Sequence, residues 1–176
     1  MKFLVISQLA IGTKTFQLNN LTANGRLDVI MRCILASQRR LSGGDPQTNT
    51  IYCFLKGGET EGWIEWNSII DSDDEISIAS KIKVSWDEVF HIGNICNLMD
   101  KIDHKSTILL SETGNSYEQL VPIDTNPLFV LGAQNDLTSE DLEIISPDHL
   151  LSLSDQPMLA SHAIIKLRQI LTIKNL

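Results

Sequence analysis

Leu128-Phe129-Val130-Leu131-Gly132 is the stretch that decides the fold, because it is an apolar run of strand length that breaks at a glycine. Such a run indicates a buried strand. The segment Leu151-Ser152-Leu153-Ser154, just before the last helical pattern, has a similar character. Open parallel sheets bind ligands beyond the carboxyl ends of their strands. We therefore expect the functional site where these two segments end.

Apolar runs of strand length alternate with segments of helical period along the chain. This alternation predicts an α/β fold with a mostly parallel sheet, in which crossover helices join the strands. The predicted strands cover residues 3–6, 51–55, 82–84, 108–110, 128–131 and 150–153.

Two long helices follow from apolar residues spaced three and four apart. The first is entered through Asn24-Gly25 and has its stripe at Leu27, Ile30, Met31, Ile34 and Leu35. The last is expected to begin at Asp155 and Pro157, with a stripe at Ala160, Ala163, Ile164, Leu167, Ile170 and Leu171. The two alanines are small enough to let this helix approach either its own sheet or a second copy of the chain.

Two further helices are indicated by capping residues. Ser85 and Glu88 have the spacing of a capping box, which predicts a helix that buries Val89, Ile92, Cys96 and Met99. Thr138 is expected to cap a short acidic helix that ends at Ser146-Pro147.

Composition narrows the class of protein. The chain has 176 residues, of which 43% are hydrophobic, so it can bury a sizeable core. Its net charge of -8 argues against a protein that coats nucleic acid, because such binding depends on Lys and Arg neutralising phosphates. Any RNA contact is therefore expected to be local or formed by a dimer groove. Apolar residues never run to membrane-spanning length, so we expect a soluble protein.

The cysteines and the missing motifs exclude several chemistries. Cys33, Cys53 and Cys96 lie singly in apolar stretches, which predicts buried, reduced thiols in a cytoplasmic protein. The sequence contains no GxGxxG, GxxxxGK[ST], CxxC or HExxH motif, so Rossmann dinucleotide binding, nucleotide hydrolysis and zinc hydrolysis have no local support, and we expect no metal site.

Three blocks of sequence, taken together and in order, resemble one family. The first is residues 18–21 (LNNL) followed by residues 25–32 (GRLDVIMR), the second is residues 128–132 with the acidic helix after them, and the third combines Ser152-Leu153 with residues 159–162 (LASH). They resemble the archaeal tRNA pseudouridine N1-methyltransferases and their bacterial relatives, within the SPOUT superfamily of trefoil-knotted methyltransferases.

The resemblance implies a fold and a set of partners. It implies a single SPOUT-like domain over residues 1–176, with a mostly parallel sheet, helices on both faces and a deep C-terminal trefoil knot. It also implies a cytoplasmic homodimer that binds S-adenosylmethionine (SAM) in the knot crevice and acts in tRNA processing, with tRNA as the possible substrate.

The resemblance places the cofactor on three loops at strand ends. Leu131, Leu153 and Leu159 would form apolar walls around the cofactor, although ordinary core packing explains each leucine as well. The full set of implied cofactor-binding residues is Leu110, Ser111, Glu112, Leu131, Gly132, Leu151, Ser152, Leu153, Ser154, Met158 and Leu159.

Arg26 and Asp28 match the GRLD part of the first block, which implies that they hold the target nucleotide and assist catalysis. The acceptor nitrogen must lose a proton as it takes the methyl group, so a carboxylate and a nearby cation would both help. The residues also allow a simpler interpretation, because Asp28 and Arg32 lie four apart and can form an ion pair along a helix.

Departures from the family pattern keep other functions open. Ala133-Gln134 stand where the family usually has Asp-His, Ser154 replaces a glycine, and Ala163 replaces a cysteine. The alternatives are a non-catalytic member of the same fold, which binds SAM, a nucleoside or a protein partner, and a methyltransferase with an acceptor other than RNA.

Overall fold

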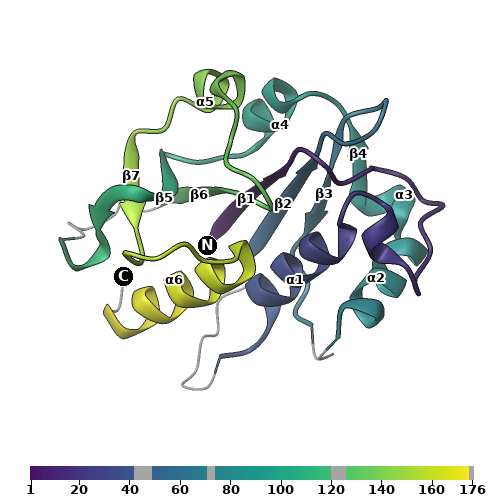
Figure 1. Cartoon of the computed structure of the whole chain (residues 1–176), viewed down its shortest axis with the longest axis horizontal. Coiled ribbons are helices and arrows are strands. Elements are labelled where there is room, and N and C mark those ends of the chain that lie inside the picture. The colour runs from purple at the N-terminus through teal and green to yellow at the C-terminus, as the bar shows by residue number, and fades with distance from the viewer. Residues whose placement is uncertain (42–48, 71–73, 120–125, 175–176) are drawn as a thin grey trace.

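The centre of the computed structural model is a twisted sheet, and the structure describes residues 1–41, 49–70, 74–119 and 126–174. The strands in these ranges are β1 (Lys2–Ser7), β2 (Thr50–Leu55), β3 (Gly62–Trp66), β4 (Phe90–Ile92), β5 (Ser106–Ser116), β6 (Pro127–Gly132) and β7 (His149–Ser152). They form a seven-stranded sheet in the order β4-β3-β2-β1-β6-β5-β7 (Figure 1).

Most of the sheet is parallel, as predicted. Strand β1 pairs in parallel with both β2 and β6, β5 pairs in parallel with β6 and β7, and only the β2–β3 and β3–β4 pairs are antiparallel. In register, Val5 lies between Cys53 and Leu131. The carboxyl ends of five strands therefore meet at one edge of the sheet.

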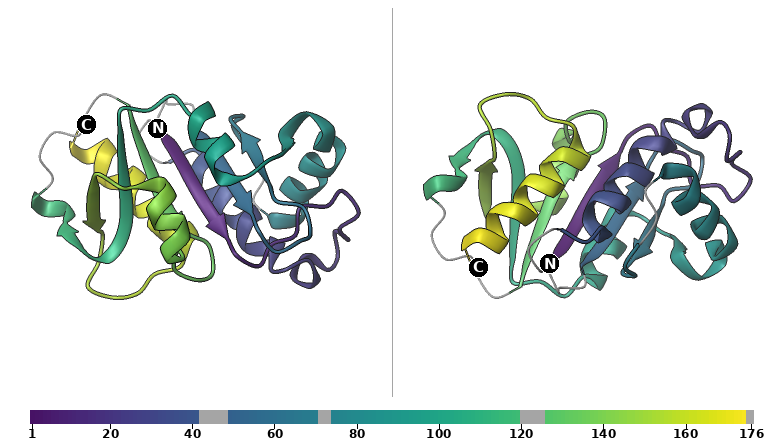
Figure 2. Two further views of the ribbon diagram at one scale, coloured as in Figure 1. Left: turned by 90° about the horizontal axis from the view of Figure 1, so that it is seen from above. Right: turned by 90° about the horizontal axis from the view of Figure 1, so that it is seen from below.

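Helices cover both faces of the sheet, which confirms the predicted layering (Figures 1 and 2). One face carries α1 (Leu27–Gln38), α2 (Glu75–Val84), the single turn α3 (Trp86–Val89) and α6 (Ala160–Lys174). The other carries α4 (Ile95–Lys101) and α5 (Ser139–Ile145). Two short 3-10 turns, Leu21–Ala23 and Tyr117–Gln119, complete the described elements.

The core is divided by the sheet into two layers. Along β1, Phe3 and Val5 belong to the layer beneath α1 and α6, whereas Leu4 and Ile6 belong to the layer beneath α4 and α5. All four side chains are at most 1% exposed. Because both faces of the strand are covered by helices, its sequence is continuously apolar rather than alternating.

Helices α1, α5 and α6 have the predicted apolar faces or caps. In α6 the predicted stripe from Ala160 to Leu171 is buried, and its alanines face the chain's own core. Thr138 caps α5, accepting a hydrogen bond at Oγ1 from the Asp141 amide at 3.1 Å. The predicted start of α6 is wrong, because residues 155–159 lie outside the helix, which begins at Ala160.

The region between β2 and β5 differs from the prediction. Residues 82–84 are not a strand but the last turn of α2, which Asp74 caps by accepting a hydrogen bond from the Ser77 amide at 2.6 Å. In this turn Ile82 is buried and Val84 is 83% exposed, the one-sided burial of a surface helix.

The predicted helix from Ser85 is only the single turn α3, so its predicted extent is wrong. Ser85 makes no side-chain cap hydrogen bond, α3 ends at Val89, and the chain continues into β4 before Asn94 starts α4 with its own capping box. Strand β4 forms because it pairs with β3, which the sequence did not reveal. As a result Cys96 is exposed, while Cys33 and Cys53 are buried as predicted.

Two further expectations concern the whole chain. The trefoil knot depends on the path between β5 and β6, part of which (residues 120–125) lies outside the described residues, so the knot stays a prediction. Within the described ranges, every helix is too short or too polar to cross a bilayer.

Candidate functional site

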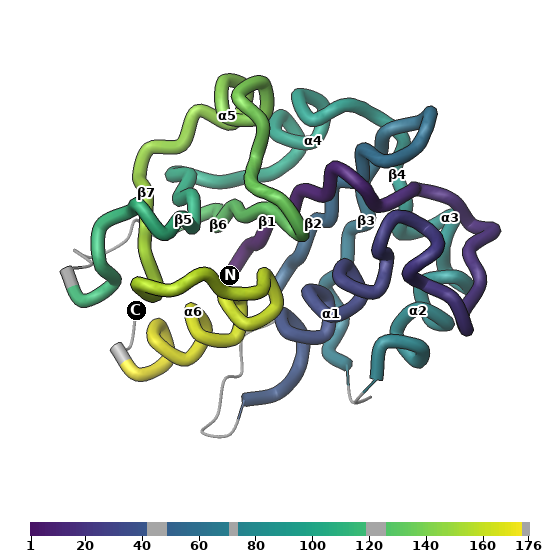
Figure 3. The backbone as a smooth tube through the Cα atoms, in the orientation of Figure 1, coloured from purple at the N-terminus to yellow at the C-terminus, as the bar shows by residue number. Residues whose placement is uncertain are grey.

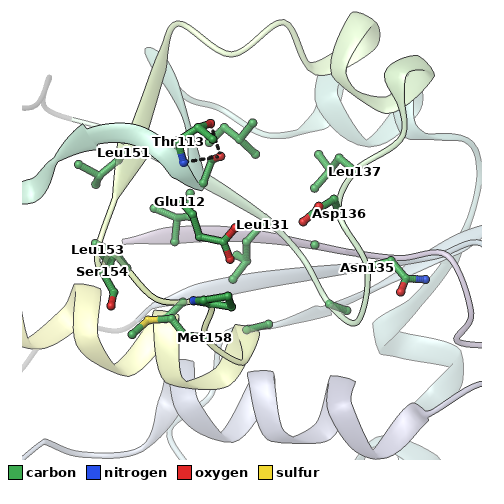
Figure 4. A pocket seen from close by; sticks show the side chains of 18 of the residues that line it. Glu112, Thr113, Leu131, Asn135, Asp136, Leu137, Leu151, Leu153, Ser154 and Met158 are labelled. Atoms are coloured by element: carbon green, nitrogen blue, oxygen red, sulfur yellow. Dashed lines mark hydrogen bonds between the residues drawn. The ribbon is translucent and has the colours of Figure 1, made fainter.

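A cavity of about 510 Å³ opens at the carboxyl edge of β5, β6 and β7. Three segments line it: residues 109–113 from β5, residues 131–137 after β6, and residues 151–160 between β7 and α6 (Figure 4). Its volume is that of a typical small-molecule site. It lies where the apolar runs of the sequence end.

Gly132 makes the second segment possible. A Cβ atom on Gly132 would lie 2.0 Å from the carbonyl oxygen of Asn135, so any side chain there would force the loop to move. The start of this loop is tied to the sheet, because the Ala133 amide donates to the carbonyl of Ile6 at 2.8 Å. The loop therefore folds back tightly and directs residues 134–137 to the cavity.

The first segment is a bulge in β5. Leu110 and Asn115 both pair with Leu151 of β7, so residues 111–114 leave the ladder at the cavity. The hydroxyls of Ser111 and Thr113 lie 3.0 Å apart, and the Thr113 amide donates to Ser111 Oγ at 3.3 Å. This local bonding shapes the turn that carries Glu112.

The third segment runs from the end of β7 along the sheet edge and then reverses into α6 (Figure 3). Ser152 Oγ donates to the Ser154 carbonyl at 3.0 Å, and the Gln156 amide donates to Ser154 Oγ at 3.2 Å. Ser154 and Met158 line the cavity, whereas Ser152 and Leu159 do not. Ser152 is buried and Leu159 is 58% exposed.

The other predicted cofactor residues all line the cavity, and sequence reasoning missed several of its walls. Leu131 and Leu153 are both core residues and cavity walls, whereas Leu159, the third leucine of that prediction, does not line the cavity. The polar residues 134–136, which directly follow the buried strand β6, were a signal that could have identified some of the lining residues that were missed. The additional lining residues are Leu109, Thr113, Ala133, Gln134, Asn135, Asp136, Leu137, Leu142, Gln156, Pro157, Ala160 and Ala163.

The cavity is acidic. Glu112 and Asp136 come from different segments, and their carboxylates point toward each other across the cavity (Figure 4). None of the described residues that line the cavity is basic. The site is therefore suited to a ligand that carries positive charge.

Arg26 and Asp28 form a tight pair at the start of α1. Arg26 Nε and Nη2 donate to the two carboxylate oxygens of Asp28, each at 3.0 Å. Arg26 occupies the N-cap with φ 63°, and its side chain is 51% exposed, whereas that of Asp28 is 12% exposed. The fork geometry of this pair fixes the guanidinium plane.

Asp28 also binds Arg32, so the simpler sequence interpretation is correct as well. Arg32 in turn forms an ion pair with Glu75 of α2, with 3.2 Å between Arg32 Nε and Glu75 Oε1. The hydrogen bond from Arg26, together with the charges of both arginines, outweighs burial and lowers the pKa of Asp28. Asp28 is therefore a weak base that orients Arg26.

Gln134 connects this pair to the cavity. It lines the cavity, its Nε2 donates to the Arg26 carbonyl at 3.3 Å, and its Oε1 accepts from Ser7 Oγ at 2.7 Å. Neither Arg26 nor Asp28 lines the cavity, but the backbone of Arg26 contacts Gln134, which does. The fold thus joins blocks of sequence that are about a hundred residues apart.

A buried polar network behind the second segment was not predicted. The Asp141 side chain is fully buried and accepts hydrogen bonds from Lys56 Nζ at 2.7 Å, Gln8 Nε2 at 2.6 Å and the Thr138 amide at 3.2 Å. Burial raises the pKa of Asp141, but the hydrogen bonds from Lys56, Thr138 and Gln8 outweigh it, so the net pKa is lowered. The network fixes α5 and its preceding loop to the ends of β1 and β2.

Metal binding has no support in the part of the chain that the structure describes, where no three His, Cys, Asp or Glu side chains gather as a metal site would need.

Comparison with known proteins gives a consistent picture. A family model described as "Putative SAM-dependent RNA methyltransferase" matches residues 1–175. The chain is 27% identical over 188 residues to a tRNA (pseudouridine(54)-N(1))-methyltransferase of Methanococcoides burtonii, with 93% of this chain and 91% of that protein covered.

Two solved structures share the fold. The crystal structure of Archaeoglobus fulgidus Nep1 bound to S-adenosylhomocysteine matches with a TM-score of 0.64 and 11% identity, covering 99% of this chain and 98% of that one. The SpoU methyltransferase AviRb of Streptomyces viridochromogenes, in complex with AdoMet, matches with a TM-score of 0.53 and 9% identity, covering 98% of this chain and 57% of that one.

Proposed function

Because the chain belongs to the family of SAM-dependent RNA methyltransferases, we propose that it methylates N1 of pseudouridine in tRNA. The acceptor assignment is supported by the Methanococcoides burtonii relative, which carries that activity in its name and aligns over nearly the whole chain. The observation that carries the proposal is the juxtaposition of the cavity with Arg26, through Gln134.

The residues of the cavity fit SAM in size and in chemistry. Leucines 131, 151 and 153 offer apolar walls for the adenine and the methionine chain, and the tight loop at Gly132 lets the backbone approach a ligand closely. Glu112 and Asp136 supply negative charge for a cationic ligand. When bound, SAM supplies a methyl group carried on a positively charged sulfur. The neutral thioether that remains after transfer is a good leaving group.

Arg26 would act on the acceptor. Its half-exposed guanidinium, held by Asp28, can donate hydrogen bonds to a pyrimidine carbonyl oxygen and stabilise the negative charge that develops as the N1 proton passes to solvent water. Asp28 then serves as a positioning residue, because its lowered pKa makes it a poor proton acceptor. Holding the nucleotide in line with the methyl group is the main task of the protein.

The proposal includes a cytoplasmic homodimer with a trefoil knot. Leu159 is 58% exposed and Met158 is 36% exposed, so the segment that enters α6 leaves apolar surface that a second copy would cover. A dimer would also add a second chain to the RNA surface. That addition matters here because a net charge of -8 leaves little general attraction for RNA.

The test is methyl transfer from labelled SAM to tRNA transcripts with and without pseudouridine. We expect label only in the pseudouridine-containing RNA, with loss of transfer in Arg26→Ala. Lys101→Ala is the matched control, because it removes one positive charge at the β3–β4 edge, where Lys101 pairs with Glu65 at 2.6 Å. It should leave the activity intact.

The other outcomes identify the alternatives. Binding of SAM without label in any RNA would favour a non-catalytic member of the fold. Label in a protein or small molecule, but not in RNA, would favour a different acceptor. Absence of SAM binding would refute the proposal as a whole.

A further inference from the structure

The two carboxylates of the cavity have no counter-charge. Glu112 and Asp136 lie on separate segments, and neither forms an ion pair with a described residue. Both are solvent-exposed residues that line the cavity, and the remaining lining residues are apolar or uncharged. A cavity with this charge attracts cations.

This charge bears on the difference between the two forms of the cofactor. SAM carries a positive sulfonium, whereas S-adenosylhomocysteine (SAH), the product after methyl transfer, has a neutral sulfur at the same place. Their adenosine, amino and carboxylate groups are the same. Any field in the cavity therefore changes the relative affinity of the two molecules only through the sulfur.

We propose that Glu112 and Asp136 make the cavity select the charged methyl donor over its neutral product. The inference rests on the proposed function of this cavity as the SAM site. In Figure 4 the two carboxylates approach the middle of the cavity from opposite sides, between the apolar walls. A positive sulfur held in that space is attracted by both carboxylates, and the attraction ends when the methyl group leaves.

A second use of the carboxylates predicts a different result. Carboxylates can accept hydrogen bonds from ribose hydroxyls, but that contact is the same in SAM and SAH and weakens both equally when it is lost. Selection by charge instead changes the ratio of the two affinities. The ratio of dissociation constants therefore separates the two roles.

The expected size follows from Coulomb's law. A unit positive charge about 6 Å from a carboxylate in a well-solvated site gains affinity on the order of three-fold, and two such carboxylates gain on the order of ten-fold. The preference should shrink as salt is added. Because the positive charge is lost during transfer, the carboxylates favour binding of the donor and release of the product, not the chemical step itself.

The experiment is calorimetric titration of the whole protein with SAM, SAH and sinefungin, in which a carbon that carries an amino group replaces the sulfur and its methyl group. The variants are Glu112→Gln, Asp136→Asn and the double substitution. Glu143→Gln is the matched control, because Glu143 is an exposed carboxylate of α5 that does not line the cavity. Circular dichroism verifies that each variant is folded.

Glu112→Gln and Asp136→Asn are each expected to reduce the preference for SAM over SAH by about three-fold. The preference for sinefungin over SAH should fall by a similar factor, and Glu143→Gln should leave both preferences unchanged. An unchanged ratio in both variants, whether or not both ligands bind more weakly, would overturn the charge selection while leaving the SAM site intact. Failure of the parent protein to bind either SAM or SAH would instead refute the proposed function.

Discussion

Replacing Lys56 by methionine tests the buried network that supports the cavity loop. The substitution keeps most of the side-chain volume of Lys56 but removes the ammonium group that lies 2.7 Å from Asp141 Oδ1. Asp141 is then left as a fully buried carboxylate without its cation. The loop before α5, which Asp141 binds through the Thr138 amide, loses part of its anchor to β2.

The magnitude follows from the burial of the pair. Breaking a fully buried ion pair typically costs about 3–5 kcal/mol, because the remaining charge is uncompensated. Here Lys56 is 17% exposed, and Asp141 keeps its hydrogen bonds from Gln8 and Thr138. We therefore expect a loss of about 2–3 kcal/mol in the free energy of unfolding at neutral pH.

The pH dependence gives a second signature. The folded-state pKa of Asp141 is lowered from its ordinary value of 3.8, so the pair stabilises the protein above that value and the stability is lost as the pH falls through the lowered pKa. Without Lys56 the pKa rises. The difference in stability between parent and variant should therefore be full at neutral pH and narrow as the pH falls through the raised pKa of the variant and then the lowered pKa of the parent.

The assay is urea unfolding of the parent, Lys56→Met, Asp141→Asn and the double variant, at neutral and acidic pH. Lys101→Met is the control, since its exposed pair with Glu65 is worth at most about 1 kcal/mol. The double-mutant cycle isolates the coupling between Lys56 and Asp141. A cost below that of the control, or a cost that persists unchanged in acid, would refute the reasoning.

Three further predictions follow from single contacts. Gly132→Ala places a Cβ atom 2.0 Å from the Asn135 carbonyl, so we expect SAM binding, measured by calorimetry, to be weakened or lost while far-ultraviolet circular dichroism is retained. Asp28→Asn releases the guanidinium that Asp28 orients, so methyl transfer is expected to fall on the order of ten- to a hundred-fold with unchanged affinity for SAM; an equal loss of both would contradict the positioning role. In a thiol-labelling assay of the folded protein, the exposed Cys96 should react first, because burial raises the pKa of Cys33 to about 12, and fast reaction of all three thiols would contradict the packing described.

Much of the fold was predictable because its signals are local. The apolar run of residues 128–131 lies in β6, and the spacing from Leu27 to Leu35 matches one face of α1. Such patterns indicate whether one or both faces of an element are buried, and they can be recognised within a stretch of about ten residues. Residues 82–84 were wrongly predicted as a strand, because the β-branched pair Ile82 and Val84 is compatible with a strand as well as with the end of a helix.

The site could be predicted only in part. Resemblance to a family placed Gly132 and Leu153 at the cavity and Arg26 near it, whereas spacing alone left each of them open to an ordinary structural role. Glu112 was implied, but its position opposite Asp136 depends on how two separate loops fold. The alternation of the chain indicated an edge where strands end, but not which side chains would face one another there.

By itself the sequence determined the mostly parallel α/β architecture, the five parallel strands and the buried faces of α1 and α6, because hydrophobic period is a property of neighbouring residues. Only the tertiary structure decided the β3–β4 pairing and the meeting of Gln8, Lys56 and Asp141. These contacts join residues that lie far apart along the chain. These contacts become stabilising only when the packed structure excludes water from between the groups. The spacing of residues in the sequence does not indicate where that happens.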